Sequence, residues 1–132
     1  MLNSARTVFL GVAATLMLFG AAGFTFVLLP DLHGDLVEIG VRPTVLGGTV
    51  VHLYFAGLAM FGFALIAGWA LIQSVRGIAT ATLPLAVAAL VEFGFGAIAF
   101  STSHSPHHLG PVASGMLLLA ALVMPDRTRR PV

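Results

Sequence analysis

One stretch of the chain contains its one carboxylate within an apolar run and three of its five histidines, and it reads Leu90-Val91-Glu92-Phe93-Gly94-Phe95-Gly96-Ala97-Ile98-Ala99-Phe100-Ser101-Thr102-Ser103-His104-Ser105-Pro106-His107-His108-Leu109-Gly110-Pro111. Glu92 stands alone among apolar neighbours, and the three histidines fall within five residues at the other end. Apolar runs precede and follow this stretch. We therefore predict that Glu92 lies inside a membrane-spanning helix and that the histidines lie in a loop at its end.

The composition of the chain points to the lipid bilayer as its solvent. Of 132 residues, 58% are hydrophobic and only 8% are charged, whereas soluble domains carry about 25% charged residues to face water. The net charge of +1 does not suggest nucleic-acid binding. The absence of cysteine excludes disulfides, thiolate metal sites, Fe–S clusters and covalently attached c-type haem.

Four apolar runs are long enough to span a membrane, since about 20 helical residues cross a hydrocarbon core of roughly 30 Å. They cover residues 8–29, 45–72, 81–100 and 106–124. The predicted fold is a single all-α membrane domain over residues 1–132. Its four transmembrane helices run up-down-up-down, and short loops make consecutive helices antiparallel neighbours. A cleaved signal peptide is the alternative for the first run, but that run is longer than the usual apolar core of about 7 to 15 residues.

Two prolines mark expected boundaries. Pro30 ends the first run and opens a polar loop over residues 30–44, whose partly apolar face would suit a short helix at the membrane interface. Ser105 and Pro106 form a typical N-cap and first-turn pair for the fourth helix. Pro111 lies inside that helix and would leave the carbonyl of His107 without its usual partner.

The arginines predict the orientation. Arg6, Arg76 and a basic C-terminal tail with Arg127, Arg129 and Arg130 all fall on one side of the predicted membrane. The positive-inside rule then places both the N- and C-termini in the cytoplasm, in the inner or plasma membrane of the cell. The loops over residues 30–44 and 101–105 would face outward.

Glu92 needs a partner, because a charged group within the bilayer costs about 2.5 to 3.5 kcal/mol on insertion scales. Counted from the outer ends of their helices, His52 lies roughly 10 Å deep and Glu92 about 12 Å deep. We predict that these two side chains face each other inside the bundle, with Tyr54 and Arg42 as further candidates. The pair would carry protons or bind a ligand, or it would form a structural hydrogen bond that fixes helix packing.

The histidine cluster suggests a metal site. His104, His107 and His108 follow the pattern H-x-x-H-H, and neutral imidazole is a common ligand of zinc, copper and nickel. On a helix, residues 104 and 108 would share a face. The first loop would supply the remaining ligands, namely Asp31, His33 and Asp35. A b-type haem between His52 and a loop histidine is another possibility, and contact with water or lipid headgroups is the alternative to both.

The segment Arg42-Pro43-Thr44-Val45-Leu46-Gly47-Gly48 leads into the second span. Together with the four-span layout, it resembles small four-helix bacterial membrane proteins of the DoxX-like kind. This resemblance implies an accessory or small-molecule role and identifies no catalytic residue.

The functional expectation is a non-enzymatic protein, because the sequence contains no Ser-His-Asp triad, phosphate loop or dinucleotide fingerprint. It would be an accessory subunit, or a binder of a small molecule or helix, with a polar site near the outer face. Its partners would be the lipid bilayer and either further copies of itself or other membrane subunits. The alternative is an outer-face metal- or haem-binding protein with a redox or metal-delivery role.

Overall fold

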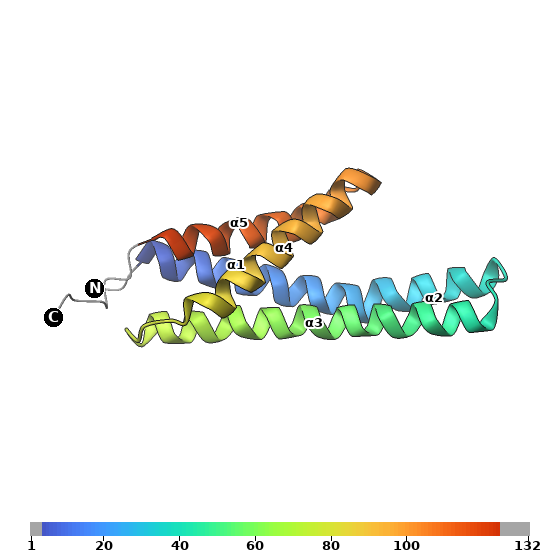
Figure 1. The fold of residues 1–132 in the computed structure, drawn as a ribbon, viewed down its shortest axis with the longest axis horizontal. Coiled ribbons are helices and arrows are strands. Elements are labelled where there is room, and N and C mark those ends of the chain that lie inside the picture. The colour runs from blue at the N-terminus through green and yellow to red at the C-terminus, as the bar shows by residue number, and fades with distance from the viewer. Residues whose placement is uncertain (1–3, 125–132) are drawn as a thin grey trace.

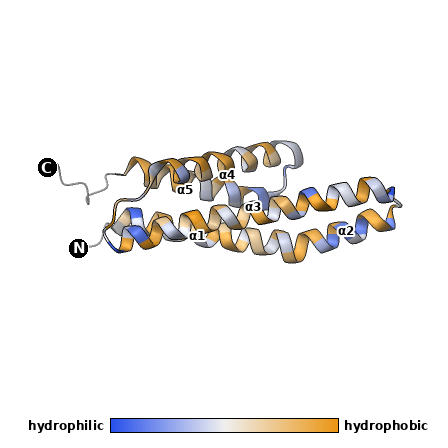
Figure 2. Cartoon of the chain, turned by 60° about the horizontal axis from the view of Figure 1, so that its bottom comes forward, coloured by the Kyte–Doolittle hydropathy of each residue, from blue (hydrophilic) through white to orange (hydrophobic). Residues whose placement is uncertain are grey.

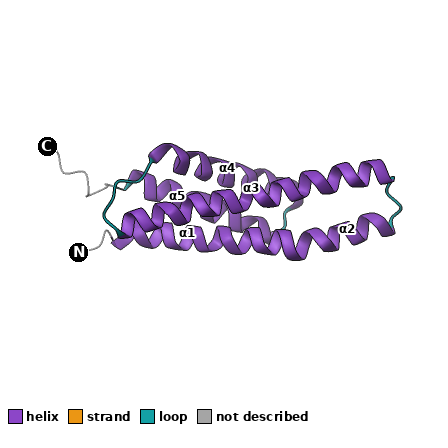
Figure 3. Cartoon of the chain, turned by 90° about the horizontal axis from the view of Figure 1, so that it is seen from below, coloured by secondary structure: helices purple, strands orange, loops and turns teal. Residues whose placement is uncertain are grey.

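The computed structural model describes residues 4–124, which fold into helices without any strand. Figure 1 shows the arrangement and Figure 3 the short connections between helices. Four elements are long: α1 (Ser4–Gly23), α3 (Pro43–Val75), α4 (Thr82–Ser103) and α5 (Leu109–Val123). The short ones are a π-helix η1 (Phe24–Leu28), the helix α2 (Leu29–Glu38) and a 3-10 helix η2 (Pro106–His108). The predicted all-helical fold with four long apolar helices is confirmed.

The first helix continues through Pro30, where the sequence predicted its end. The five-residue π turn η1 comes immediately before, and the N–H of Leu29 donates to the carbonyl of Phe24, five residues back. A proline ring clashes with the carbonyl four residues before it in a regular α-helix. The wider π turn moves the preceding carbonyl groups out of the regular α-helical positions, which relieves this clash. The helix α2 therefore follows α1 without a break. The expected loop over residues 30–44 is wrong, because most of it is the helical extension α2.

The two helical hairpins differ in length. The helix from Ala5 to Glu38 has 34 residues and α3 has 33, so each is about 50 Å long at a rise of 1.5 Å per residue. In the second hairpin, α4 has 22 residues and the helix from Pro106 to Val123 has 18, which gives about 33 and 27 Å. Figure 1 shows α2 and the start of α3 extending well past the tip of the α4–α5 hairpin.

The packing order differs from the order in the sequence. α1 packs against both α3 and α5, and α4 packs against α5. The expected adjacency of consecutive helices therefore holds for α1 with α3 and for α4 with α5. It fails for most of α3 and α4, which diverge after the turn that joins them (Figure 1). The start of α1 and the end of α5 lie at the same end of the molecule.

The core lies at the end of the molecule where α1 begins and α5 ends, and it is built mainly from alanine. Its largest fully buried apolar side chains include Leu10, Leu85 and Leu118, and the rest of the buried cluster is Ala13, Met17, Ala64, Ala67, Ala70, Ala88, Ala89 and Ala121. Small residues let membrane helices approach closely. Among residues 4–124, the other end has no comparable core, because there the two hairpins separate.

Glycine sets the closest approach between α4 and α5. A Cβ atom on Gly115 would lie 2.6 Å from the backbone nitrogen of Phe93, and one on Gly96 would lie 2.6 Å from the nitrogen of Val112. Only glycine fits at these two positions without moving a helix.

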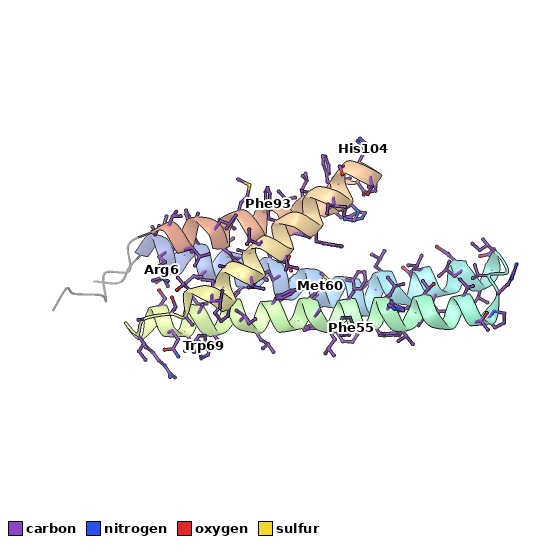
Figure 4. The ribbon with its side chains drawn as sticks, in the orientation of Figure 1. Arg6, Phe55, Met60, Trp69, Phe93 and His104 are labelled. Atoms are coloured by element: carbon purple, nitrogen blue, oxygen red, sulfur yellow. The ribbon has the colours of Figure 1, made fainter. Side chains whose placement is uncertain are left out.

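Large apolar side chains cover the outside of the molecule. Phe19, Phe55 and Leu65 are among the most exposed, and Figure 4 shows Phe55 and Trp69 pointing away from the bundle. Hydrophobic colour dominates the long helices in Figure 2, while hydrophilic patches appear on α2 and at the start of α1.

Candidate functional site

The candidate site is centred on Glu92, in the middle of α4. Its side chain is only 6% exposed, and its Oε2 atom accepts a hydrogen bond of 3.2 Å from the hydroxyl of Ser114 on α5. Ser114 is itself buried and immediately precedes Gly115, where α5 touches the backbone of α4. The close helix contact therefore places the serine hydroxyl beside the carboxyl group.

The hydroxyl of Ser114 lies between two oxygen atoms. Its Oγ is 3.2 Å from Glu92 Oε2 and 3.0 Å from the carbonyl oxygen of Pro111. A hydroxyl has one hydrogen to donate and two lone pairs that accept. It therefore cannot give both oxygens a full hydrogen bond at the same time.

Glu92 faces an apolar groove between the two hairpins, which we call the inter-hairpin groove. The Glu92 lobe of this groove has a volume of about 270 Å³. Its lining residues come from η1, α3 and α4: Phe24, Leu53, Ala56, Ala59, Met60, Phe63, Val91, Glu92 and Phe95. In Figure 4, Met60 lies on the side of α3 that faces α1, near the point where the hairpins diverge.

A second lobe adjoins the first and reaches the tip of the α4–α5 hairpin. This histidine lobe has a volume of about 340 Å³ and shares Phe24, Met60 and Phe95 with the Glu92 lobe. His107, His108 and Pro111 line its other side. The two lobes together form an apolar space with a carboxyl group in one part and two imidazoles in the other.

Among the described residues, Glu92 forms no side-chain hydrogen bond with any of its predicted partners. His52 is exposed on α3, and its Nδ1 lies 2.6 Å from the carbonyl oxygen of Gly48, one turn earlier in the same helix. Tyr54 is 50% exposed, and Arg42 is the exposed residue that precedes α3. The structure gives Glu92 and His52 different hydrogen-bond partners, because equal depth in the bundle does not fix the direction in which a side chain points.

The three clustered histidines do not share a helix face. His104 ends α4 in the left-handed conformation, with φ of 54°, and lies at the free tip of the hairpin (Figure 4). The rings of His107 and His108 lie side by side with centroids 4.2 Å apart. The hydroxyl of Ser105 lies 2.7 Å from Nδ1 of His107 and does not cap the following turn.

The expected metal site is not assembled. Asp31, His33 and Asp35 lie exposed on α2, and the longer first hairpin carries them past the tip that holds the other histidines (Figure 1). Within residues 4–124, no three histidine, aspartate or glutamate side chains come together in a way that could hold a metal ion. The extension of α2 as a continuous helix is the physical reason.

A second polar cluster closes the opposite end of the bundle. The guanidinium of Arg6, buried at the start of α1, donates to the hydroxyl of Thr80 in the turn before α4. Thr7 and Ser74 join their hydroxyls at 2.9 Å. These contacts connect α1 to the end of α3 and to the α3–α4 turn.

Sequence reasoning missed Ser114 as the partner of Glu92. The available signal was a polar residue in an otherwise apolar helix, three residues after Pro111 and next to a glycine. Arg6 and Thr80 were missed as partners because they are 74 positions apart in the chain.

Comparisons of the chain with protein-family models, with curated proteins and with solved structures found no match.

Proposed function

We propose that the chain is an integral protein of the cell membrane, with four transmembrane helices and both termini in the cytoplasm. Four helices of sufficient length and apolar character support this placement. Arg6 at the start of α1 and Arg76 at the end of α3 support the orientation. The tips of both hairpins then face outward. Because the first hairpin is longer than a whole bilayer of about 40–45 Å, α2 reaches into the headgroup region or beyond.

The absence of native cysteine offers a direct test of this orientation. We expect a membrane-impermeant thiol reagent to label Asp35→Cys in intact cells, because Asp35 is exposed on α2. Ile78→Cys, which is exposed in the α3–α4 turn, should react only after the cells are opened. Labelling of Ile78→Cys alone in intact cells would reverse the orientation.

The function we propose is non-enzymatic binding of a lipophilic small molecule in the inter-hairpin groove. One observation carries this proposal: a buried carboxyl group, with a serine hydroxyl as its hydrogen-bond partner, lines an otherwise apolar groove. Ionisable residues within a membrane are costly and mark ligand or ion sites by default. An apolar space with a few convergent polar groups is typical of small-molecule sites. An accessory or small-molecule role is also what the DoxX-like resemblance implies.

The test is binding of a neutral lipophilic probe, N-phenyl-1-naphthylamine, counted by native mass spectrometry of the purified protein. We expect one probe per chain. Ala59→Phe places a large ring in the groove wall and should weaken binding at least tenfold. Ala97→Phe, on an exposed part of α4, is the matched control and should bind normally. Equal binding by wild type and Ala59→Phe would show that the probe sits elsewhere.

A further inference from the structure

The surroundings of Glu92 suit a neutral carboxyl group better than a carboxylate. Among the described residues, Ser114 is the one side-chain hydrogen-bond partner of Glu92, at 3.2 Å, and its single hydrogen is shared with the Pro111 carbonyl at 3.0 Å. A carboxylate offers about four acceptor sites, and the other residues that line the Glu92 lobe are all apolar. A protonated carboxyl needs fewer partners and can itself donate to Ser114 Oγ.

A cation bound in the groove would instead favour the ionised form of Glu92. Three phenyl rings line the Glu92 lobe, from Phe24, Phe63 and Phe95, and the faces of aromatic rings attract cations, most strongly away from water. The residues that line this lobe include no basic side chain. A cation there would have the carboxylate as counter-ion and aromatic walls around its apolar body.

We propose that Glu92 holds a proton in the empty groove and exchanges it for an organic cation with an apolar body. This inference rests on the proposed binding function and names its ligand class. The step is an exchange: the neutral carboxyl releases one proton to water, and the cation binds beside the resulting carboxylate. The net charge of the groove stays the same, so the membrane never has to accommodate an unpaired charge there.

Other titratable groups near the groove are few. His107 and His108 line the histidine lobe, while His52 and Tyr54 lie exposed on α3. Arg6 is at the opposite end of α1, and α5 carries no titratable side chain. Variants of Glu92 therefore separate its proton from those of the histidines.

The experiment compares two ions of the same shape and opposite charge, tetraphenylphosphonium and tetraphenylborate, with the protein in lipid nanodiscs. We expect binding of the phosphonium at least tenfold tighter than that of the borate, after correction for binding to empty nanodiscs. Calorimetry in two buffers with different ionisation enthalpies should report close to one proton released per cation. Affinity for the cation should then rise about tenfold per pH unit while Glu92 is protonated in the empty protein.

Glu92→Gln should lose the proton release and at least nine-tenths of the cation affinity, yet still bind the neutral probe, which also shows that it is folded. Glu92→Asp keeps a carboxyl group and should retain proton release. Glu38→Gln, which removes an exposed carboxylate at the end of α2, is the matched control and should behave as wild type. Unchanged cation binding in Glu92→Gln, or binding without proton release, would overturn the exchange.

The two proposals fail differently. If wild type binds neither the neutral probe nor the cation, the proposed binding function itself is wrong. If it binds the neutral probe but not the cation, only the exchange is wrong.

Discussion

The contact at Gly115 makes a quantitative prediction about how α4 and α5 hold the site together. In Gly115→Ala, the new Cβ would lie 2.6 Å from the backbone nitrogen of Phe93, where ordinary contacts begin at 3.4 Å. The helices must therefore separate by about 0.8 Å, since backbone atoms cannot rotate away. The same movement would lengthen the 3.2 Å hydrogen bond between Ser114 and Glu92 to about 4.0 Å, beyond hydrogen-bonding range.

We expect Gly115→Ala to lower the free energy of unfolding by about 1 to 3 kcal/mol. Overpacking costs about 1 to 3 kcal/mol and the lost hydrogen bond about 1 kcal/mol, while the higher helix propensity of alanine returns about 1 kcal/mol. The assay is titration from mild detergent into SDS, followed by the fluorescence of Trp69, the single tryptophan.

The matched control is Gly94→Ala, two residues from Glu92, where an added Cβ meets nothing within 4 Å. It should leave stability unchanged or raise it by up to about 1 kcal/mol through helix propensity. If both alanine variants unfold at the same SDS concentration, the close approach of α4 and α5 described above is incorrect.

Three further substitutions test individual contacts by the same assay. Thr25→Val replaces a buried hydroxyl without a hydrogen-bond partner, so stability should hold or rise by up to about 1 kcal/mol; a clear loss would mean that the hydroxyl is bonded. Thr80→Val removes one acceptor of the Arg6 guanidinium and should cost about 1 to 3 kcal/mol, whereas an unchanged midpoint would contradict that contact. His52→Leu should change stability by no more than about 0.5 kcal/mol and leave binding in the groove intact, and loss of binding would restore His52 as a partner of Glu92.

Apolar runs predicted the helices well because a membrane helix needs about 20 consecutive apolar residues. The predicted span over residues 81–100 corresponds to α4 (Thr82–Ser103), and the predicted span over residues 45–72 corresponds to α3 (Pro43–Val75). The error at Pro30 has a local cause. The usual rule ends a helix near proline, but the π turn at Phe24–Leu28 removes the clash, and nothing in the sequence signals that turn. The prediction therefore placed His104, His107 and His108 too close to Asp31 and Asp35.

The partner of Glu92 was harder to predict than its burial. Helix rise gave His52 and Glu92 similar depths, but depth says nothing about the direction of a side chain around the helix axis. That direction depends on which helices pack together, and α1 packs against α5 where the loops suggested α3 against α4. The serine that bonds Glu92 is positioned by Gly115 and Pro111, which act through the backbone of α5.

The alanine-rich core has a consequence for how this protein tolerates mutation. In a core of large side chains, truncations that leave cavities are a main source of damage. Ala13, Ala67, Ala88 and Ala121 are almost completely buried, yet each has only one methyl group to lose. Here the damaging substitutions are those that enlarge the side chain, because each added carbon pushes two packed helices apart. We therefore expect these positions to tolerate only glycine, alanine and serine, and the large exposed side chains on the outside of the molecule to tolerate exchange with one another.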